Sequence, residues 1–151
     1  MKNIFKISLL ILMVVFVGCT NQLESNRKLC FTPPSGFNFE IVNKTSGENL
    51  FTNGTYQSNQ ITIIDLSNNS KVPFTFIAEN GQNIISIHTI GWKTEKINYT
   101  INIEEKAIFS LYVDATRISD GCSYTEFNEV AIKNSDFEFN QNTGIYKILI
   151  P

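Results

Sequence analysis

Residues 97–113 read Ile-Asn-Tyr-Thr-Ile-Asn-Ile-Glu-Glu-Lys-Ala-Ile-Phe-Ser-Leu-Tyr-Val, and this stretch decides the fold. Apolar and polar side chains alternate on both sides of a short charged segment, with the period of two that is typical of a half-buried β-strand. We expect a hairpin with a three-residue loop at 104–106, because its register brings apolar residues opposite one another on one face. The pairs predicted are Ile103–Ala107, Ile101–Phe109, Tyr99–Leu111 and Ile97–Val113.

Two further hairpins pass the same test of register. Asn80-Gly81 is a strong signal for a two-residue turn, closed between Glu79 and Gln82. A four-residue loop is predicted at 141–144, between two other alternating segments. The predicted pairs are Phe76–Ile85 and Phe74–Ile87 in the first hairpin, and Phe139–Tyr146 and Phe137–Ile148 in the second.

The rest of the chain after residue 29 continues this pattern and contains no convincing amphipathic helix. The sequence therefore predicts an all-β domain over residues 30–151, an antiparallel two-sheet sandwich of eight or nine strands. Long irregular links at 43–60 and 115–127 favour the sandwich, because such links can cross between sheets. An eight-stranded up-and-down barrel is the alternative, since three links are tight hairpins. The side chains expected to fill the interior are Phe37, Phe39, Phe74, Phe76, Phe109, Phe137 and Phe139.

Composition limits the classes of function. The chain has 151 residues, of which 42% are hydrophobic, enough for one domain with a substantial core. Its formal net charge of −2 argues against a nucleic-acid binder that works by neutralising phosphates. With one histidine and three cysteines, we expect no metal site and no cofactor.

The first nineteen residues have the form of a secretory signal. Lys2 and Lys6 precede an apolar stretch at 7–17, which is too short to span a bilayer as a helix. The segment Phe16-Val17-Gly18-Cys19 resembles the lipobox of bacterial lipoproteins, with Phe16 where leucine is usual. That resemblance implies removal of a signal peptide at 1–18, and diacylglyceryl and N-acyl (palmitate-type) chains on Cys19. An ordinary signal peptide and an uncleaved anchor are the alternatives.

The residues after Cys19 bear on location. Residues 19–29 are polar and are expected to be a tether. Thr20 stands where lipoproteins kept in the inner membrane usually have aspartate, which implies the outer membrane. The tether has Glu24 as its only acidic residue, so an orientation toward the periplasm is favoured over exposure at the cell surface.

Cys30 and Cys122 form an even pair after Cys19 is assigned to lipid. Outside the cytoplasm such a pair predicts a disulfide. Closing a loop of this length would stabilise the fold by about 4–5 kcal/mol in the chain-entropy model. Two buried free thiols are the alternative.

Residues 39–50 read Phe-Glu-Ile-Val-Asn-Lys-Thr-Ser-Gly-Glu-Asn-Leu. This strand and turn resemble the opening of transthyretin-like and carboxypeptidase-regulatory-like β-modules. The chain with its lipobox, its Cys-Phe-Thr-Pro-Pro segment at 30–34 and this turn also resembles small β-sandwich lipoproteins of Bacteroidota. The resemblances imply a β-fold and an envelope location, and bring no catalytic residues.

Polar side chains on the predicted strands suggest a binding face. If the strands at 84–92, 95–103 and 106–114 are neighbours, their outward residues form one surface with the aromatic and amide groups that bind sugars or peptides. The candidate ligand-binding residues are His88, Trp92, Asn98, Thr100 and Tyr112. Ser86 and His88 lie on the same side of a strand, but at about 7 Å spacing along it, with no nucleophile elbow.

These observations favour a non-catalytic binding or scaffolding domain, held at the bacterial outer membrane by a lipid anchor. The expected partners are the membrane itself and an envelope protein or glycan, and not nucleic acid. A lipocalin-like carrier of a small apolar ligand is the alternative if the fold is a hollow barrel. A hydrolase is the least supported of the three.

Overall fold

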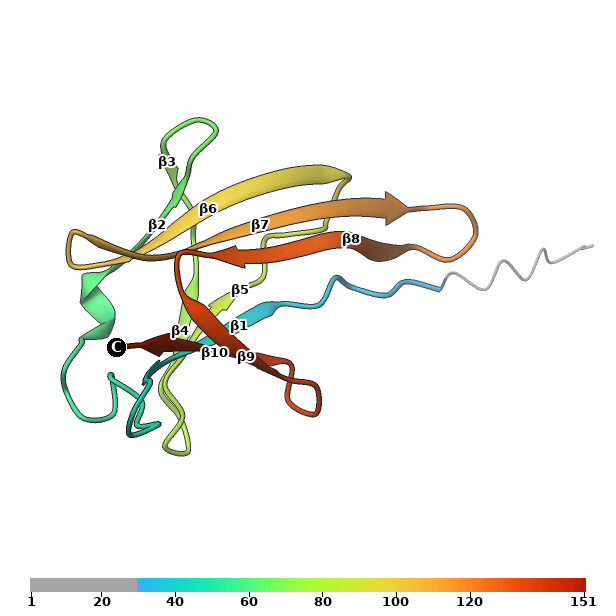
Figure 1. The fold of residues 1–151 in the computed structure, drawn as a ribbon. Helices are drawn as coiled ribbons and strands as arrows, with labels where there is room; N and C mark the ends of the chain where they lie inside the picture. Colours follow the sequence, from blue (N-terminus) through green and yellow to red (C-terminus); the bar gives the residue numbers. More distant parts are fainter. Residues whose placement is uncertain (1–29) are drawn as a thin grey trace, which may run out of the picture.

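The computed structural model describes residues 30–151, whose strands stack in two layers (Figure 1). The predicted signal peptide, Cys19 and the tether lie outside the described residues. No helix in the described range is long and apolar enough to cross a membrane. In chain order the elements are β1 (Phe37–Asn43), the 3₁₀ turn η1 (Ser58–Gln60), β2 (Ile61–Asp65), β3 (Ser70–Lys71), β4 (Thr75–Ile77), β5 (Ile84–Ile87), β6 (Glu95–Ile103), β7 (Lys106–Ile118), β8 (Tyr124–Lys133), β9 (Asp136–Asn140) and β10 (Ile145–Ile150).

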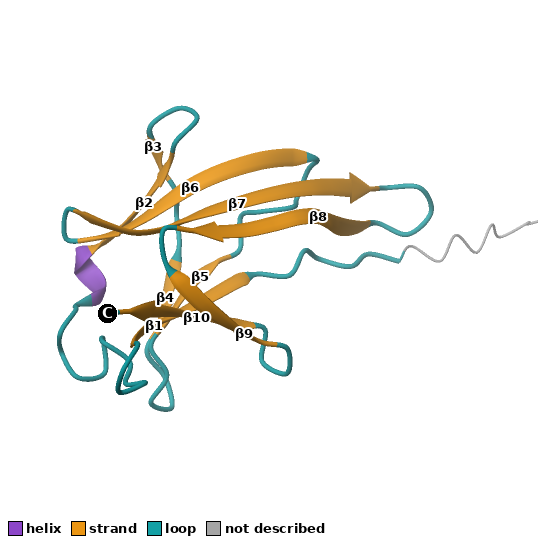
Figure 2. Ribbon diagram, in the orientation of Figure 1, coloured by secondary structure: helices purple, strands orange, loops and turns teal. Residues whose placement is uncertain are grey.

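The strands form two five-stranded sheets (Figure 2). The first, sheet I, has the order β4-β5-β1-β10-β9, and the second, sheet II, has the order β3-β2-β6-β7-β8. The predicted all-β sandwich is confirmed, and the barrel alternative is wrong because the sheets do not close on each other. The described chain has ten strands, one more than the eight or nine expected. The additional strand is β3, whose two residues are too few to give an alternating pattern in the sequence.

One pair of strands departs from the antiparallel expectation. β1 and β10 are parallel neighbours at the centre of sheet I, with Phe39 beside Tyr146 and Ile41 beside Ile148. All other strand pairs are antiparallel. The first and last strands of the described chain therefore hold each other in register across the middle of the sheet.

The predicted hairpin registers are confirmed away from the turns. The pairs Ile101–Phe109, Tyr99–Leu111 and Ile97–Val113 form as expected, as do Phe76–Ile85, Phe139–Tyr146 and Phe137–Ile148. Ile103 pairs with Lys106, and not with Ala107, because a bulge at Ile108 adds a residue to β7. The bulge lets Ile108 join the core next to Phe109. Phe74 precedes β4, so the predicted pair with Ile87 is not formed.

The two long links behave differently. Residues 44–60 carry the chain from β1 in sheet I to β2 in sheet II, as predicted. The expected crossing at 115–127 is wrong, because β7 and β8 continue through this range as one antiparallel hairpin in sheet II. A bulge at Asn128 of β8 brings Phe127 opposite Ala115, and β7 continues past this fully buried residue to Ile118.

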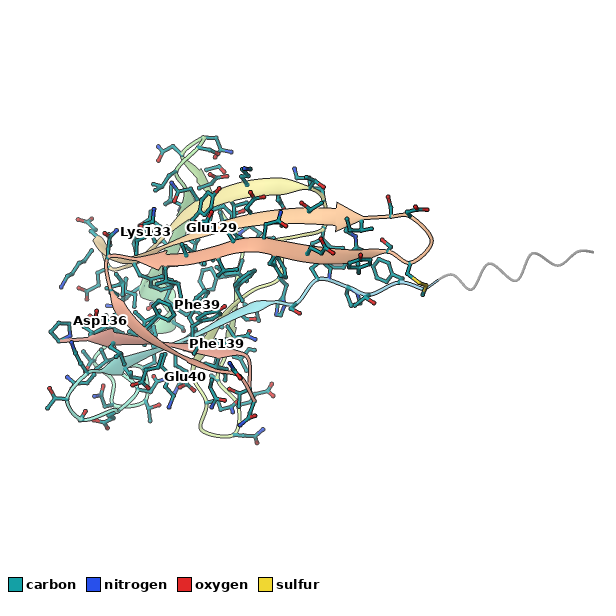
Figure 3. All side chains as sticks on the ribbon, turned by 45° about the vertical axis from the view of Figure 1, so that its right-hand side comes forward. Phe39, Glu40, Glu129, Lys133, Asp136 and Phe139 are labelled. Atoms are coloured by element: carbon teal, nitrogen blue, oxygen red, sulfur yellow. A yellow bond between two sulfur atoms is a disulfide. The ribbon has the colours of Figure 1, made fainter. Side chains whose placement is uncertain are left out.

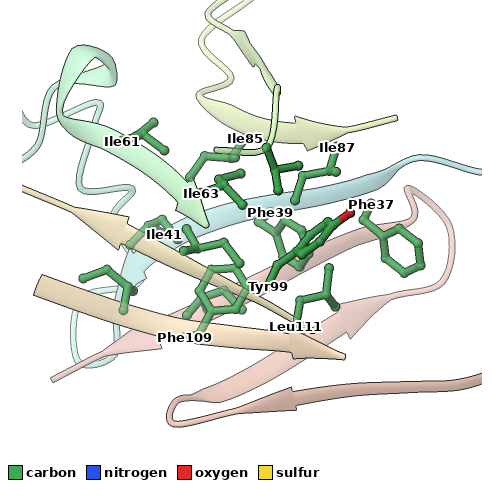
Figure 4. Close-up of a cluster of buried hydrophobic side chains, with 14 of the residues drawn as sticks. Phe37, Phe39, Ile41, Ile61, Ile63, Ile85, Ile87, Tyr99, Phe109 and Leu111 are labelled. Atoms are coloured by element: carbon green, nitrogen blue, oxygen red, sulfur yellow. The ribbon is translucent and has the colours of Figure 1, made fainter. Parts of the chain in front are cut away.

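The core lies between the sheets (Figure 4). Phe39 from β1 and Phe109 from β7 are fully buried, with ring centroids 4.9 Å apart. Of the other phenylalanines expected inside, Phe37 is buried, while Phe74 and Phe76 are half-buried against the core. The prediction is wrong for Phe137 and Phe139, which are 43% and 47% exposed, because β9 is the outermost strand of sheet I.

Candidate functional site

The predicted ligand-binding face is divided between the two sheets. Asn98, Thr100 and Tyr112 lie on β6 and β7 of sheet II, with Asn98 opposite Tyr112 as expected. His88 directly follows β5 of sheet I, and Trp92 lies in the link from β5 to β6. The assumption that β5 and β6 are neighbours in one sheet is therefore wrong, and with it the single continuous face.

The link between β5 and β6 explains the error. In the sequence its residues continue the alternation of the strand, but Ile90 is 1% exposed and belongs to the core. Gly91 turns the chain with a φ of +88°, a conformation that favours glycine. A Cβ at this position would lie 2.9 Å from Thr125 Cγ2 and 3.2 Å from Phe127 Cε1. Close packing of the link on β8 thus requires glycine.

Ser86 and His88 come closer than strand spacing predicts. The Ser86 hydroxyl is 2.7 Å from His88 Nε2, because His88 lies beyond the end of β5 and its ring turns back over Gly36. The Ser86 hydroxyl also donates to Asn38 Oδ1 over 2.5 Å. The expectation of separated side chains is therefore wrong.

The hydrogen bonds of Ser86 and His88 nevertheless run in the opposite direction from those of a catalytic nucleophile and its base. The single hydroxyl proton of Ser86 goes to Asn38, so His88 Nε2 donates to the serine oxygen and does not accept its proton. Ser86 is also fully buried, and within residues 30–151 no carboxylate hydrogen-bonds to His88. The arrangement suits the fastening of β5 to β1 better than hydrolysis.

The outer face of β6, β7 and β8 is a network of mutual polar contacts. Lys96 and Asp114 form an ion pair at 2.9 Å, and Asn128 donates to Thr116 Oγ1 at 2.9 Å. The hydrogen bond from Lys96 lowers the pKa of the Asp114 carboxyl, and Asp114 in turn raises the pKa of Lys96. These contacts are typical of a solvated sheet surface.

At one side of the sandwich, β8 and β9 are the outermost strands of their sheets. A turn at Asn134–Ser135 joins the two strands, and β9 descends from Asp136 toward Phe139 (Figure 3). Their inward-facing side chains are incompletely covered, since Val130 is 37% exposed and the phenylalanines of β9 more so. We call this surface the open flank and define it by Phe127, Val130, Ile132, Phe137 and Phe139.

Aromatic contacts run from the open flank into the core. Tyr146 lies at their centre, with its ring centroid 4.4 Å from that of Phe139 and 6.0 Å from that of Phe137. Phe37 links Tyr146 to Phe127, at centroid distances of 6.4 Å and 5.2 Å. Desolvation raises the pKa of the Tyr146 phenol. The open flank is therefore an ordered aromatic surface supported from behind.

The alternation in the sequence predicts that the phenylalanines of β9 face inward, but it does not predict their exposure. One signal was available: Asp136 and Glu138 alternate with them in a five-residue strand. Short strands with charged residues are typical of sheet edges.

The remaining predictions concern the cysteines, metals and relatives. Cys30 and Cys122 form the predicted disulfide. Residues 30–151 contain no group of three side chains suited to a metal ion. Comparisons with protein-family models, curated proteins and solved structures found no match for this chain.

Proposed function

We propose that this protein is an envelope lipoprotein, held at the outer membrane through Cys19, whose β-sandwich is a non-catalytic binding module. The open flank is its binding surface, and the ligand is an extended segment of another envelope protein. The observation that carries the proposal is the exposure of inward-facing apolar residues on two edge strands, Phe137 and Phe139 on β9 and Val130 on β8. Exposed aromatic side chains in a defined surface are characteristic of interaction sites.

Strand addition explains how such a segment would bind. β9 pairs with β10 on one side, and its other edge pairs with no strand of residues 30–151. An incoming strand would continue sheet I through main-chain hydrogen bonds. Because side chains alternate along a strand, every second residue of the segment would cover Phe137, Phe139 and Val130.

The chemistry of the open flank favours apolar peptide side chains over a glycan. Its five defining residues carry no hydrogen-bonding groups on their side chains. Sugar recognition combines aromatic stacking with polar contacts, and the polar candidates Asn98, Thr100 and Tyr112 lie on the outer face of sheet II.

The two alternatives have less support. A carrier needs a hollow interior, whereas Phe39, Phe109 and Ile148 are fully buried between the sheets. A hydrolase would rely on Ser86 and His88, whose hydrogen bonds have the wrong polarity. Assay of the wild type and His88→Ala against ester and peptide substrates tests this, and activity lost in the variant would favour the hydrolase.

The anchor is tested separately from the binding surface. The mature protein, purified from membranes, should have the intact mass of a chain that begins at Cys19 and carries the acyl groups. Cys19→Ala should leave the membrane fraction. A wild type whose mass shows an unmodified Cys19 would refute the anchoring.

The binding surface is tested by site-specific crosslinking in cells. A photo-crosslinking amino acid replaces Phe139 on the open flank or, as the control, Tyr112 on the outer face of sheet II. We expect a discrete adduct with another envelope protein from position 139 and none from position 112. An adduct from position 112 alone would transfer the site to the outer face of sheet II. An adduct of twice the chain's mass would identify a second copy as the occupant and contradict the proposal.

A further inference from the structure

The two most exposed large apolar side chains of the described residues lie together. Phe31 is 60% exposed and Trp92 is 53% exposed, and their rings stack with centroids 6.2 Å apart. The guanidinium carbon of Arg117 lies 5.1 Å from the centre of the Phe31 ring. We call these three residues the end patch.

Hydrogen bonds hold the end patch in place. Trp92 donates its indole N–H to the carbonyl of His88 over 2.7 Å. Arg117 donates to Thr32 O at 3.0 Å and to Thr125 Oγ1 at 2.8 Å. Two exposed aromatic rings are thus held in fixed positions, so little side-chain entropy remains to be lost when another surface covers them.

The end patch lies where the chain enters the domain. Phe31 follows Cys30 directly, and the disulfide to Cys122 fixes this entry beside the turn between β7 and β8, at one end of the sandwich (Figure 1). Ten residues, 20–29, separate Cys19 from Cys30. A chain of that length spans at most about 35–40 Å, so an acylated Cys19 would keep the end patch near the bilayer surface.

We propose that the end patch rests in the interfacial region of the membrane and orients the domain there. Tryptophan is enriched at the membrane–water interface, phenylalanine inserts at the boundary between headgroups and acyl chains, and an arginine beside them suits lipid phosphates. Tethering raises the effective concentration of the patch at the membrane to the order of millimolar, so weak intrinsic affinity suffices. This inference rests on the proposed lipid anchor.

Apart from the contact of Arg117 with phosphate, the attraction is apolar in origin. Asp120 lies in the loop that precedes Cys122, and the chain as a whole is acidic, so anionic lipid gains little from the net charge. With the end patch on the bilayer, β7 and β8 lead away from it (Figure 1), and the open flank lies along the side where β8 and β9 are the edge strands.

Trp92 is the only tryptophan of the chain, so its fluorescence reports directly on the end patch. The full mature protein, purified from membranes and checked for acyl groups by intact mass, is reconstituted into phosphatidylethanolamine–phosphatidylglycerol vesicles. Matched vesicles carry bromine either near the ester end or near the methyl end of the acyl chains. We expect a blue-shifted emission, with stronger quenching by bromine near the ester end.

Two variants test whether the end patch causes the blue shift and the quenching. Phe31→Ser should weaken the quenching and reverse the blue shift, while Phe139→Ser, which removes a comparably exposed phenylalanine from the open flank, should leave both unchanged. Thermal melts establish that both variants fold. Acylated protein that floats with vesicles but shows no quenching would overturn the end-patch proposal and leave the anchor intact. An unmodified Cys19 would overturn both, and the mass separates that case from the first.

Discussion

The two flanks of the sandwich are built differently. At the flank of β3 and β4, residues 44–60 cross from one sheet to the other and cover the core. Phe51 of this link packs against Phe76 of β4 at 5.0 Å and against Tyr56 at 5.9 Å. Leu50 is 6% exposed there. We call this side the closed flank.

The open flank has only a two-residue turn between its sheets, and nothing in residues 30–151 lies across Phe137 and Phe139. The comparison teaches that inward-facing residues are buried in a sandwich only where chain or a further strand covers the edge. Phe51 and Phe139 are both aromatic residues at an edge, but only Phe51 has a cover within its own chain. Such a difference supports a role for the open flank in binding.

The largest expected effect concerns the disulfide at the end of the sandwich, next to the start of β8, a strand of the open flank. The disulfide between Cys30 and Cys122 joins the segment before β1 to the loop before β8. The two cysteines are 92 residues apart in the sequence. Replacement of both cysteines by serine should lower the free energy of unfolding by about 4–5 kcal/mol, because the unfolded chain regains loop entropy. Urea unfolding followed by tyrosine and Trp92 fluorescence measures this loss.

Reduced wild-type protein is the control for the serine hydroxyls and should unfold at the same urea concentration as the double variant. Hydrogen exchange should quicken first in β8, while the closed flank keeps its protection. Equal acceleration on both flanks would contradict the idea that the disulfide stabilises β8 in particular.

A matched pair of truncations compares the flanks directly. Phe51→Ala should destabilise the protein by about 2–4 kcal/mol, less than a fully buried phenylalanine because the ring is half-buried. Phe139→Ala should cost about 1 kcal/mol or less, since nearly half of the side chain is already in water. Thermal and urea unfolding of the two variants give the difference. Equal losses would mean that the open flank is covered in solution, and size measurement would then test for a second copy.

The hairpins were predictable because their signals are local. Asn80-Gly81 and the alternation around it fix a register within a dozen residues, and the confirmed pair Phe76–Ile85 follows from turn geometry alone. The parallel pairing of β1 with β10 brings together residues about a hundred positions apart, and no local pattern specifies it. The assignment of β5 and β6 to different sheets depends likewise on the packing of Gly91 against β8.

The same limit explains the site. Alternation correctly placed Phe137 opposite Ile148 and therefore on the inward face of β9. Exposure depends on how many strands lie beyond β9, which is a property of the assembled sheet. His88 and Trp92 do not lie on the predicted face, because the prediction assumed a strand order that sequence periodicity does not determine.

Two glycines with positive φ, Gly91 beside the open flank and Gly47 at the closed flank, allow a second comparison of stability at the two flanks. Gly91→Ala should cost about 2–3 kcal/mol, because its Cβ would meet Thr125 and Phe127 at the base of the open flank and the backbone is strained as well. Gly47→Ala, in the link that forms the closed flank, meets no atom within 4 Å and should cost about 1 kcal/mol from backbone strain alone. Thermal melts rank the stability of the two variants. A larger loss of stability for Gly47→Ala would contradict the expectation that open space around this position makes the substitution the milder of the two.

The smallest effect concerns an exposed ion pair between the central strand and the open edge of sheet I. Lys44, just after β1, donates to Asp136 at the start of β9 over 2.7 Å. This hydrogen bond and the lysine charge lower the pKa of the Asp136 carboxyl in the folded protein. The stabilisation is therefore fully present above the unfolded pKa of about 3.9 and is lost as the pH falls through the lower folded value.

Asp136→Asn should remove this part of the pH dependence, with a melting temperature slightly below wild type at pH 7 and equal to it in acid. Because both side chains are exposed, 0.5 M salt should shrink the difference at pH 7. A difference that persists in salt and in acid would mean that Asp136 stabilises the corner between β8 and β9 by packing, and that the open flank is held by more than its turn.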